Sequence, residues 1–66
     1  MPAKFRLRPT VLQLIRQGDL PQIKELCARE HPSLQLLDVF IREASRLQQT
    51  EILVYFMNQK QGMDLA

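Results

Sequence analysis

From residue 10 onward, the apolar side chains recur with the spacing of a helix. Val11, Leu14 and Ile15 stand at i, i+3 and i+4, which places them on one helical face. Gly18 follows them, and glycine readily takes the left-handed conformation in which helices commonly end. The pattern predicts a first helix that begins at Thr10 and stops at Gly18.

A second helix is expected directly after this glycine. Asp19 is a preferred N-cap residue, and Pro21 is tolerated because it falls in the first helical turn. The apolar face of this helix carries Leu20, Ile23, Leu26 and Cys27. His31-Pro32 ends it, since the residue before a proline is pushed out of helical geometry. A turn of about two residues joins the two helices, so residues 10–30 should form an antiparallel pair.

A third helix shows the most regular pattern; Ser33 can cap it, and it runs to about Leu47. One side of it is apolar and holds Leu34, Leu37, Phe40, Ile41, Ala44 and Leu47. The other side is polar and includes Gln35, Asp38, Arg42 and Arg46. Opposite charges at helical spacing predict two ion pairs, Asp38–Arg42 and Glu43–Arg46.

A fourth helix is predicted from a cap at Thr50 to about Gln61, with Gly62 beyond its end. The run Ile52–Met57 is also rich in β-forming residues, so a buried strand is the competing interpretation. A helix is favoured because the flanking residues extend the element to about twelve residues and a strand would have no partner. The packing face of the helix would contain Ile52, Leu53, Phe56 and Met57.

These elements predict an all-α domain over residues 10–66, built from two antiparallel helix pairs at 10–30 and 33–62. Residues 1–9 are expected to form an extended basic arm, because polar and apolar residues alternate from Lys4 to Arg8. The first 16 residues carry four basic side chains and no acidic one. Positive charge is therefore concentrated toward the N-terminus, and the remainder is mildly acidic.

Length and composition limit the classes of protein that the chain can represent. A chain of 66 residues forms one domain at most, whose core supplies roughly 3–5 kcal/mol of stability. The single cysteine excludes an internal disulfide. The longest apolar run, Ile52–Met57, is far shorter than the roughly 18 residues of a membrane span, and no signal-peptide cleavage pattern is present. We therefore expect no membrane association and a reducing, cytoplasmic location.

Two stretches of the sequence resemble the ankyrin repeat. Ile15–Leu26 is similar to the region where the first helix of such a repeat ends at glycine and a short turn leads into the second helix. Glu43–Leu53 is similar to the same region one repeat later, and an offset of 30 aligns Gly18-Asp19 with Gln48-Gln49. Gln61–Leu65 resembles the turn that closes a repeat. The resemblance implies helical hairpins that bind a partner protein, alone or within a longer repeat array, with no enzymatic activity.

Few residues are candidates for chemistry. Cys27 and His31 have the i, i+4 spacing of a metal-ligand pair, but a structural zinc site needs four ligands. Cys27 lies on an apolar face, where a free cysteine behaves as a small hydrophobic residue, and His31 suits a helix end. The chain also has no glycine-rich phosphate loop. We predict no catalytic residue, no cofactor and no metal.

Apolar residues off the main helical faces predict a protein interface. Val54, Tyr55, Leu36 and Val39 are the candidate contact residues, for a second copy of the chain or for a neighbouring repeat. The expected function is a non-enzymatic protein–protein interaction module.

The alternative function is a small nucleic-acid-binding regulator that uses the basic arm. Lys4, Arg6 and Arg8 would then contact phosphates. The third helix adds little to this alternative, because Asp38 and Glu43 stand beside its outward arginines.

Overall fold

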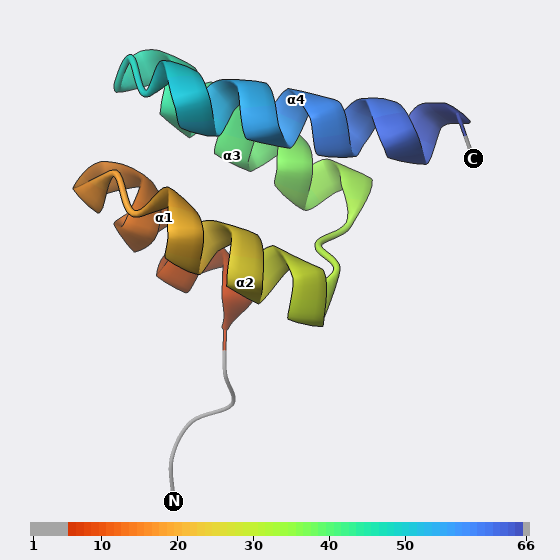
Figure 1. Ribbon diagram of the computed structural model, residues 1–66, viewed down its shortest axis with the longest axis horizontal. Helices are drawn as coiled ribbons and strands as arrows, with labels where there is room; N and C mark the ends of the chain where they lie inside the picture. The colour runs from red at the N-terminus through yellow and green to blue at the C-terminus, as the bar shows by residue number, and fades with distance from the viewer. Residues whose placement is uncertain (1–5, 66) are drawn as a thin grey trace, which may run out of the picture.

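The structure, a computed structural model, describes residues 6–65 and the side chains of residues 6–62. It contains four α-helices: α1 (Leu7–Gln17), α2 (Leu20–Glu30), α3 (Leu34–Arg46) and α4 (Thr50–Leu65). The described residues include no strand, so the run at 52–57 is helical, as predicted. Figure 1 shows two helical hairpins in two layers, with α1 beside α2 and α3 beside α4.

The two hairpins turn in the same way. Gly18 has a φ of 72° and Gln48 a φ of 58°, so both are left-handed. The N–H of Gly18 donates to the carbonyl three residues back at 3.1 Å, and that of Asp19 to the carbonyl five residues back at 3.0 Å. Gln48 and Gln49 form the same two bonds, at 3.1 and 2.9 Å. These are the bonds of a Schellman motif, and they recur at the offset of 30 residues that the sequence shows.

Two helices begin at the predicted caps. Asp19 Oδ1 accepts a hydrogen bond from the Gln22 N–H at 3.3 Å, and Ser33 Oγ accepts one from the Leu36 N–H at 3.2 Å. Each cap satisfies one of the N–H groups that a helix start leaves without an intrahelical acceptor. Between these helices His31 is the C-cap of α2 and is left-handed, with a φ of 51°, so the helix ends before Pro32 as predicted, through a left-handed residue rather than an extended one.

The extended arm was predicted too long. α1 begins at Leu7, so residues 7–9 form its first turn. Pro9 fits this position because the first N–H groups of a helix have no intrahelical acceptor to lose. Arg6 is extended, and Lys4 and the rest of the predicted arm lie outside the described residues.

α4 differs from the prediction at both ends. Thr50 is its first residue rather than its cap, and the Gln49 carbonyl accepts the first helical bond, from Leu53. Gly62 lies within the helix rather than beyond it, in open space. An exposed glycine costs a helix only about 1 kcal/mol, which does not end it. At 16 residues α4 is the longest helix, and no described helix has the length and apolar character of a membrane span.

The core draws on all four helices. Its buried side chains are Val11, Ile15, Ile23, Leu26, Cys27, Leu37, Phe40, Ala44, Ile52 and Phe56. The ring centroids of Phe40 and Phe56 are 5.3 Å apart and join α3 to α4, and α1 packs against both α2 and α3. Met57, which was predicted to pack, is instead 52% exposed, whereas Tyr55 is partly buried against the core.

Candidate functional site

The four residues predicted as an interface do not form one surface. Val54 is 50% exposed on α4. Tyr55, Leu36 and Val39 are partly buried and pack against the core. Only Val54 therefore has the exposure that the sequence led us to expect of the whole set.

Leu36 and Val39 lie on the side of α3 that faces α1. Two ion pairs mark the sides of this helix: the Glu43 carboxylate contacts α1, and the Asp38 carboxylate contacts α4. At about 100° per residue, Leu36 and Val39 are within about 40° of Glu43 and at least about 100° from Asp38. They belong to the seam between α1 and α3, away from the candidates on α4.

The outer side of α4 carries two large apolar side chains that are half exposed. Val54 and Met57 are three residues apart, and they lie about 160° and 140° around the helix from buried Ile52. Thr50 and Gln61 are also exposed and continue the same line. We call Thr50, Val54, Met57 and Gln61 the α4 stripe.

Leu34 extends the apolar part of this surface onto α3. It is 38% exposed and lies about 180° around α3 from Glu43, the residue that contacts α1. The three large apolar side chains that are exposed among the described residues therefore share the side of the α3–α4 hairpin that faces away from the α1–α2 hairpin.

Tyr55 connects α4 to α2. Its hydroxyl donates a hydrogen bond to the Cys27 sulfur, and the Lys24 Nζ lies 6.0 Å from its ring centroid. Burial raises the pKa of the Cys27 thiol, although the bond from Tyr55 opposes that rise. Burial also raises the pKa of Tyr55, and Cys27 adds to it. Because a thiol with a raised pKa is a poor nucleophile, this pair is better suited to packing than to catalysis.

A pocket with a volume of about 250 Å³ opens beside Cys27, where α2 ends and α3 begins. Its lining consists of Cys27, His31, Pro32, Ser33, Leu37 and Gln59. Within the described part of the chain, no three histidine, cysteine or carboxylate side chains come together as metal ligands. The pocket is smaller than the roughly 300–1,000 Å³ of typical ligand sites and holds no activated nucleophile.

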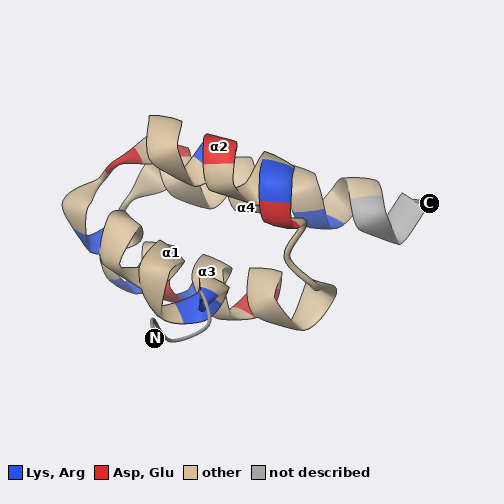
Figure 2. Ribbon diagram, turned by 90° about the horizontal axis from the view of Figure 1, so that it is seen from below, with Lys and Arg blue, Asp and Glu red and all other residues tan. Residues whose placement is uncertain are grey.

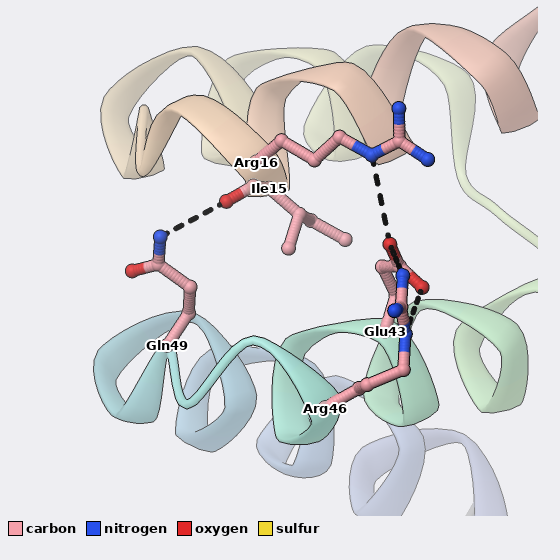
Figure 3. Close-up of polar contacts among 5 residues, drawn as sticks. All are labelled: Ile15, Arg16, Glu43, Arg46 and Gln49. Atoms are coloured by element: carbon pink, nitrogen blue, oxygen red, sulfur yellow. Dashed lines mark hydrogen bonds and ion pairs between the residues drawn. The ribbon is translucent and has the colours of Figure 1, made fainter.

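Polar contacts tie the two hairpins together near their turns (Figure 3). Gln49 Nε2 donates a hydrogen bond to the Ile15 carbonyl at 3.1 Å. The Glu43 carboxylate accepts two hydrogen bonds from Arg46, at 2.7 and 3.3 Å, and lies 3.7 Å from Arg16 Nε. The hydrogen bonds from Arg46, with the charges of both arginines, hold the pKa of Glu43 below its ordinary value. The predicted Glu43–Arg46 pair is thus confirmed, and Arg16 extends it across to α1.

The other predicted ion pair, Asp38–Arg42, does not form. Asp38 Oδ1 instead lies 2.7 Å from Lys60 Nζ, because α4 runs along that side of α3. Arg42 consequently has no ion-pair partner among residues 6–62, and neither does Arg8. Three residues were predicted to contact nucleic acid. Arg8 lies in the first turn of α1, and Arg6 is the extended residue that precedes this helix. Lys4 is outside the described residues.

No protein-family model, curated protein or solved structure matches this chain. The function is therefore inferred from the exposed surfaces of the fold. Two of them have a distinct composition: the α4 stripe, with exposed apolar side chains, and the exposed arginines of α1 and α3.

Proposed function

We propose that this chain is a non-enzymatic protein-interaction module that associates with a second copy of itself through the α4 stripe. The supporting observation is the half exposure of Val54 and Met57, one helical turn apart, in a chain with a small core. Fully burying a large aliphatic side chain stabilises by roughly 1.5–3 kcal/mol. Covering the exposed half of Val54 or Met57 at an interface would therefore contribute about half of that to the free energy of association. Four such half-exposed side chains meet in a dimer, which favours weak association.

The α4 stripe has the spacing of a helix-pairing seam. Its positions are four, three and four residues apart, as in a coiled coil. In an antiparallel pair of α4 helices about a two-fold axis, Val54 of one copy would meet Met57 of the other, and Thr50 would meet Gln61. The apolar residues would occupy the middle of the contact and the polar residues its ends.

We further propose that the two hairpins are ankyrin-like repeats. The matching Schellman bonds at Gly18 and Gln48 support this, since they recur at the offset of the sequence resemblance. In a repeat protein, consecutive hairpins stack and each covers the apolar side of its neighbour. A second copy on the outer side of the α3–α4 hairpin would then take the place of a third repeat.

The oligomeric state tests this proposal. Val54→Glu/Met57→Lys should convert a self-associating protein into a monomer, as measured by light scattering after size-exclusion chromatography. Circular dichroism should stay helical, because neither side chain is buried in the core. The matched control Gln13→Glu/Ala28→Lys introduces the same charges at exposed positions on α1 and α2 and should leave association unchanged.

Two results would contradict the proposal. A wild-type protein that is still monomeric at about 1 mM would have less than about 4 kcal/mol of association free energy, and self-association would be wrong. If Val54→Glu/Met57→Lys instead loses its helical signal, these side chains support the core of the monomer and do not form an interface.

A further inference from the structure

We infer that the arginines of α1 and α3 form a binding face for the phosphate backbone of a nucleic-acid duplex. This arginine face consists of Arg8 and Arg16 on α1 and Arg42 and Arg46 on α3, all exposed. The two helices pack side by side. They run along one side of the molecule, with α2 and α4 along the other (Figure 2).

Helical geometry places Arg16 and Arg46 at the α1–α3 seam, with Arg8 and Arg42 farther along the same two helices. Arg8 and Arg16 are separated by about 12 Å along α1, and Arg16 reaches α3 through its ion pair with that helix. Arg42 and Arg46 are one turn apart on α3. Arg46 lies about 60° around the helix from Glu43, whereas Arg42 lies about 100° from Glu43 and about 160° from buried Phe40, so it points outward at the edge of the face. Because packed helices are about 8–10 Å apart, the face is about 12 by 10 Å.

The one acidic side chain in this seam is already neutralised. Glu43 is held between Arg16 and Arg46, and its side chain is only 15% exposed. Both arginines remain largely exposed, at 61% and 66%. A guanidinium has five N–H donors, so an arginine that holds Glu43 retains donors for a second anion.

The remaining charges separate across the molecule. Arg8 and Arg42 have no ion-pair partner in residues 6–62; the carboxylate spaced to pair with Arg42, Asp38, is directed to Lys60 of α4. With four arginines and one glutamate, the arginine face carries a net charge of +3. Outside this face, residues 6–62 carry a net charge of −1, from five acidic side chains (Asp19, Glu25, Glu30, Asp38 and Glu51) and four basic ones (Arg6, Lys24, Arg29 and Lys60). This asymmetry would orient a polyanion toward the α1–α3 side.

The chemistry of the face favours a duplex over other polyanions. Guanidinium groups match phosphate oxygens with two parallel hydrogen bonds. The aromatic side chains in the described residues lie elsewhere, since Phe40 and Phe56 are buried and Tyr55 packs against α2, so residues 6–62 offer this face no platform for stacking unpaired bases. The exposed apolar residues are on the outer side of the α3–α4 hairpin, so the face has no anchor for a lipid surface.

Salt-dependent binding tests the inference. The full chain is titrated with a mixed-sequence DNA duplex of about 20 base pairs, and in parallel with an RNA duplex of the same sequence, from about 20 to 200 mM salt. Neutralising about three phosphates predicts a slope of log affinity against log salt near −2.7, which is about a 40-fold loss between 50 and 200 mM. The stronger of the two duplexes identifies the preferred backbone.

Three variants connect this binding to the arginine face. Arg8→Gln/Arg42→Gln should reduce the slope by about 1.8, because two phosphate contacts are lost. Lys24→Gln/Arg29→Gln removes the same charge from α2 and should leave the slope unchanged. Glu43→Gln should bind more tightly and with a steeper slope, because it releases Arg16 and Arg46 from their shared carboxylate.

Each contrary outcome overturns the inference. No binding to either duplex at about 20 mM salt would exclude it, since nonspecific phosphate binding is strongest there. If Arg8→Gln/Arg42→Gln and Lys24→Gln/Arg29→Gln lose equal amounts of duplex affinity, net charge alone attracts the duplex. Displacement of the duplex by polyglutamate at equal charge concentration would identify an acidic polypeptide as the partner instead. None of these results bears on the α4 stripe, which is a separate surface with its own test.

Discussion

Replacing Gln48 with glycine should stabilise this protein. Gln48 is left-handed, with a φ of 58°, at the turn position that Gly18 fills with a φ of 72° in the first hairpin. Its side chain is exposed, and no hydrogen bond or ion pair of that side chain occurs in the described residues. The substitution therefore removes backbone strain without removing a side-chain contact.

The size of the effect follows from two opposing quantities. The left-handed conformation costs a residue with a Cβ about 1–2 kcal/mol of free energy. Glycine loses about 0.5–1 kcal/mol more conformational freedom on folding than alanine does. The difference leaves a gain of about 0.5–1 kcal/mol for Gln48→Gly, which raises the melting temperature of a domain this small by about 2–8 °C.

Thermal and urea unfolding, followed by far-ultraviolet circular dichroism, measure this gain. The reciprocal variant Gly18→Ala should lose about 0.5–1 kcal/mol for the same conformational reason. Its added Cβ would also lie 3.3 Å from Gln49 Nε2, so the amide that bonds to the Ile15 carbonyl has to shift. If Gln48→Gly leaves the unfolding midpoint unchanged or lowers it, the second hairpin does not turn through a left-handed residue.

The remaining predictions concern two titratable side chains, Glu43 and Cys27. Because the folded chain lowers the pKa of Glu43, the stability it contributes is present above the ordinary glutamate pKa and is lost as pH falls through the lowered value. Urea unfolding should therefore show Glu43→Gln to be less stable than wild type at neutral pH, with a gap that closes at acidic pH; a gap that is constant with pH would contradict the ion-pair explanation. Cys27→Ser should cost about 1–2 kcal/mol, because it places a hydroxyl in an apolar site, and chelators should leave the helical signal unchanged. The wild-type thiol should react slowly with a disulfide reagent, since burial raises its pKa, and rapid reaction in the folded protein would show that Cys27 is accessible.

The turn at Gly18 and the caps at Asp19 and Ser33 could be predicted from the sequence because they depend on neighbouring residues, whereas the predicted cap at Thr50 and stop at Gly62 were wrong. Asp19 and Ser33 cap the helices that follow them, and Gly18 ends α1. Each of these is set by a side chain or a missing Cβ within about one turn of the bond that it makes. The repeated turn at Gln48 was visible only through the 30-residue offset, since glutamine gives no local signal for a left-handed conformation.

The side that each helix buries could not be predicted as well, because it depends on where the other helices lie. Met57 and Tyr55 are both apolar enough to pack, and the position of α2 decides in favour of Tyr55. In the same way, Arg42 is a suitable partner for Asp38 by spacing alone. Lys60 replaces it because α4 runs alongside α3. The arginine face was missed for this reason, since it joins residues from two helices that the turn and α2 separate in sequence.

Both proposed surfaces follow from the stacking of one hairpin on the other. The first helices, α1 and α3, lie side by side, so arginines about 30 residues apart in sequence collect on one face. The outer side of each hairpin has no neighbour among the described helices, and the exposed apolar side chains of α4 lie on the outer side of the second hairpin. Association through α4 would leave the arginine face uncovered on each copy, so a dimer would present two such faces to one duplex. A monomeric α4 variant should then keep its salt slope per chain and lose only the affinity gained from having two linked sites.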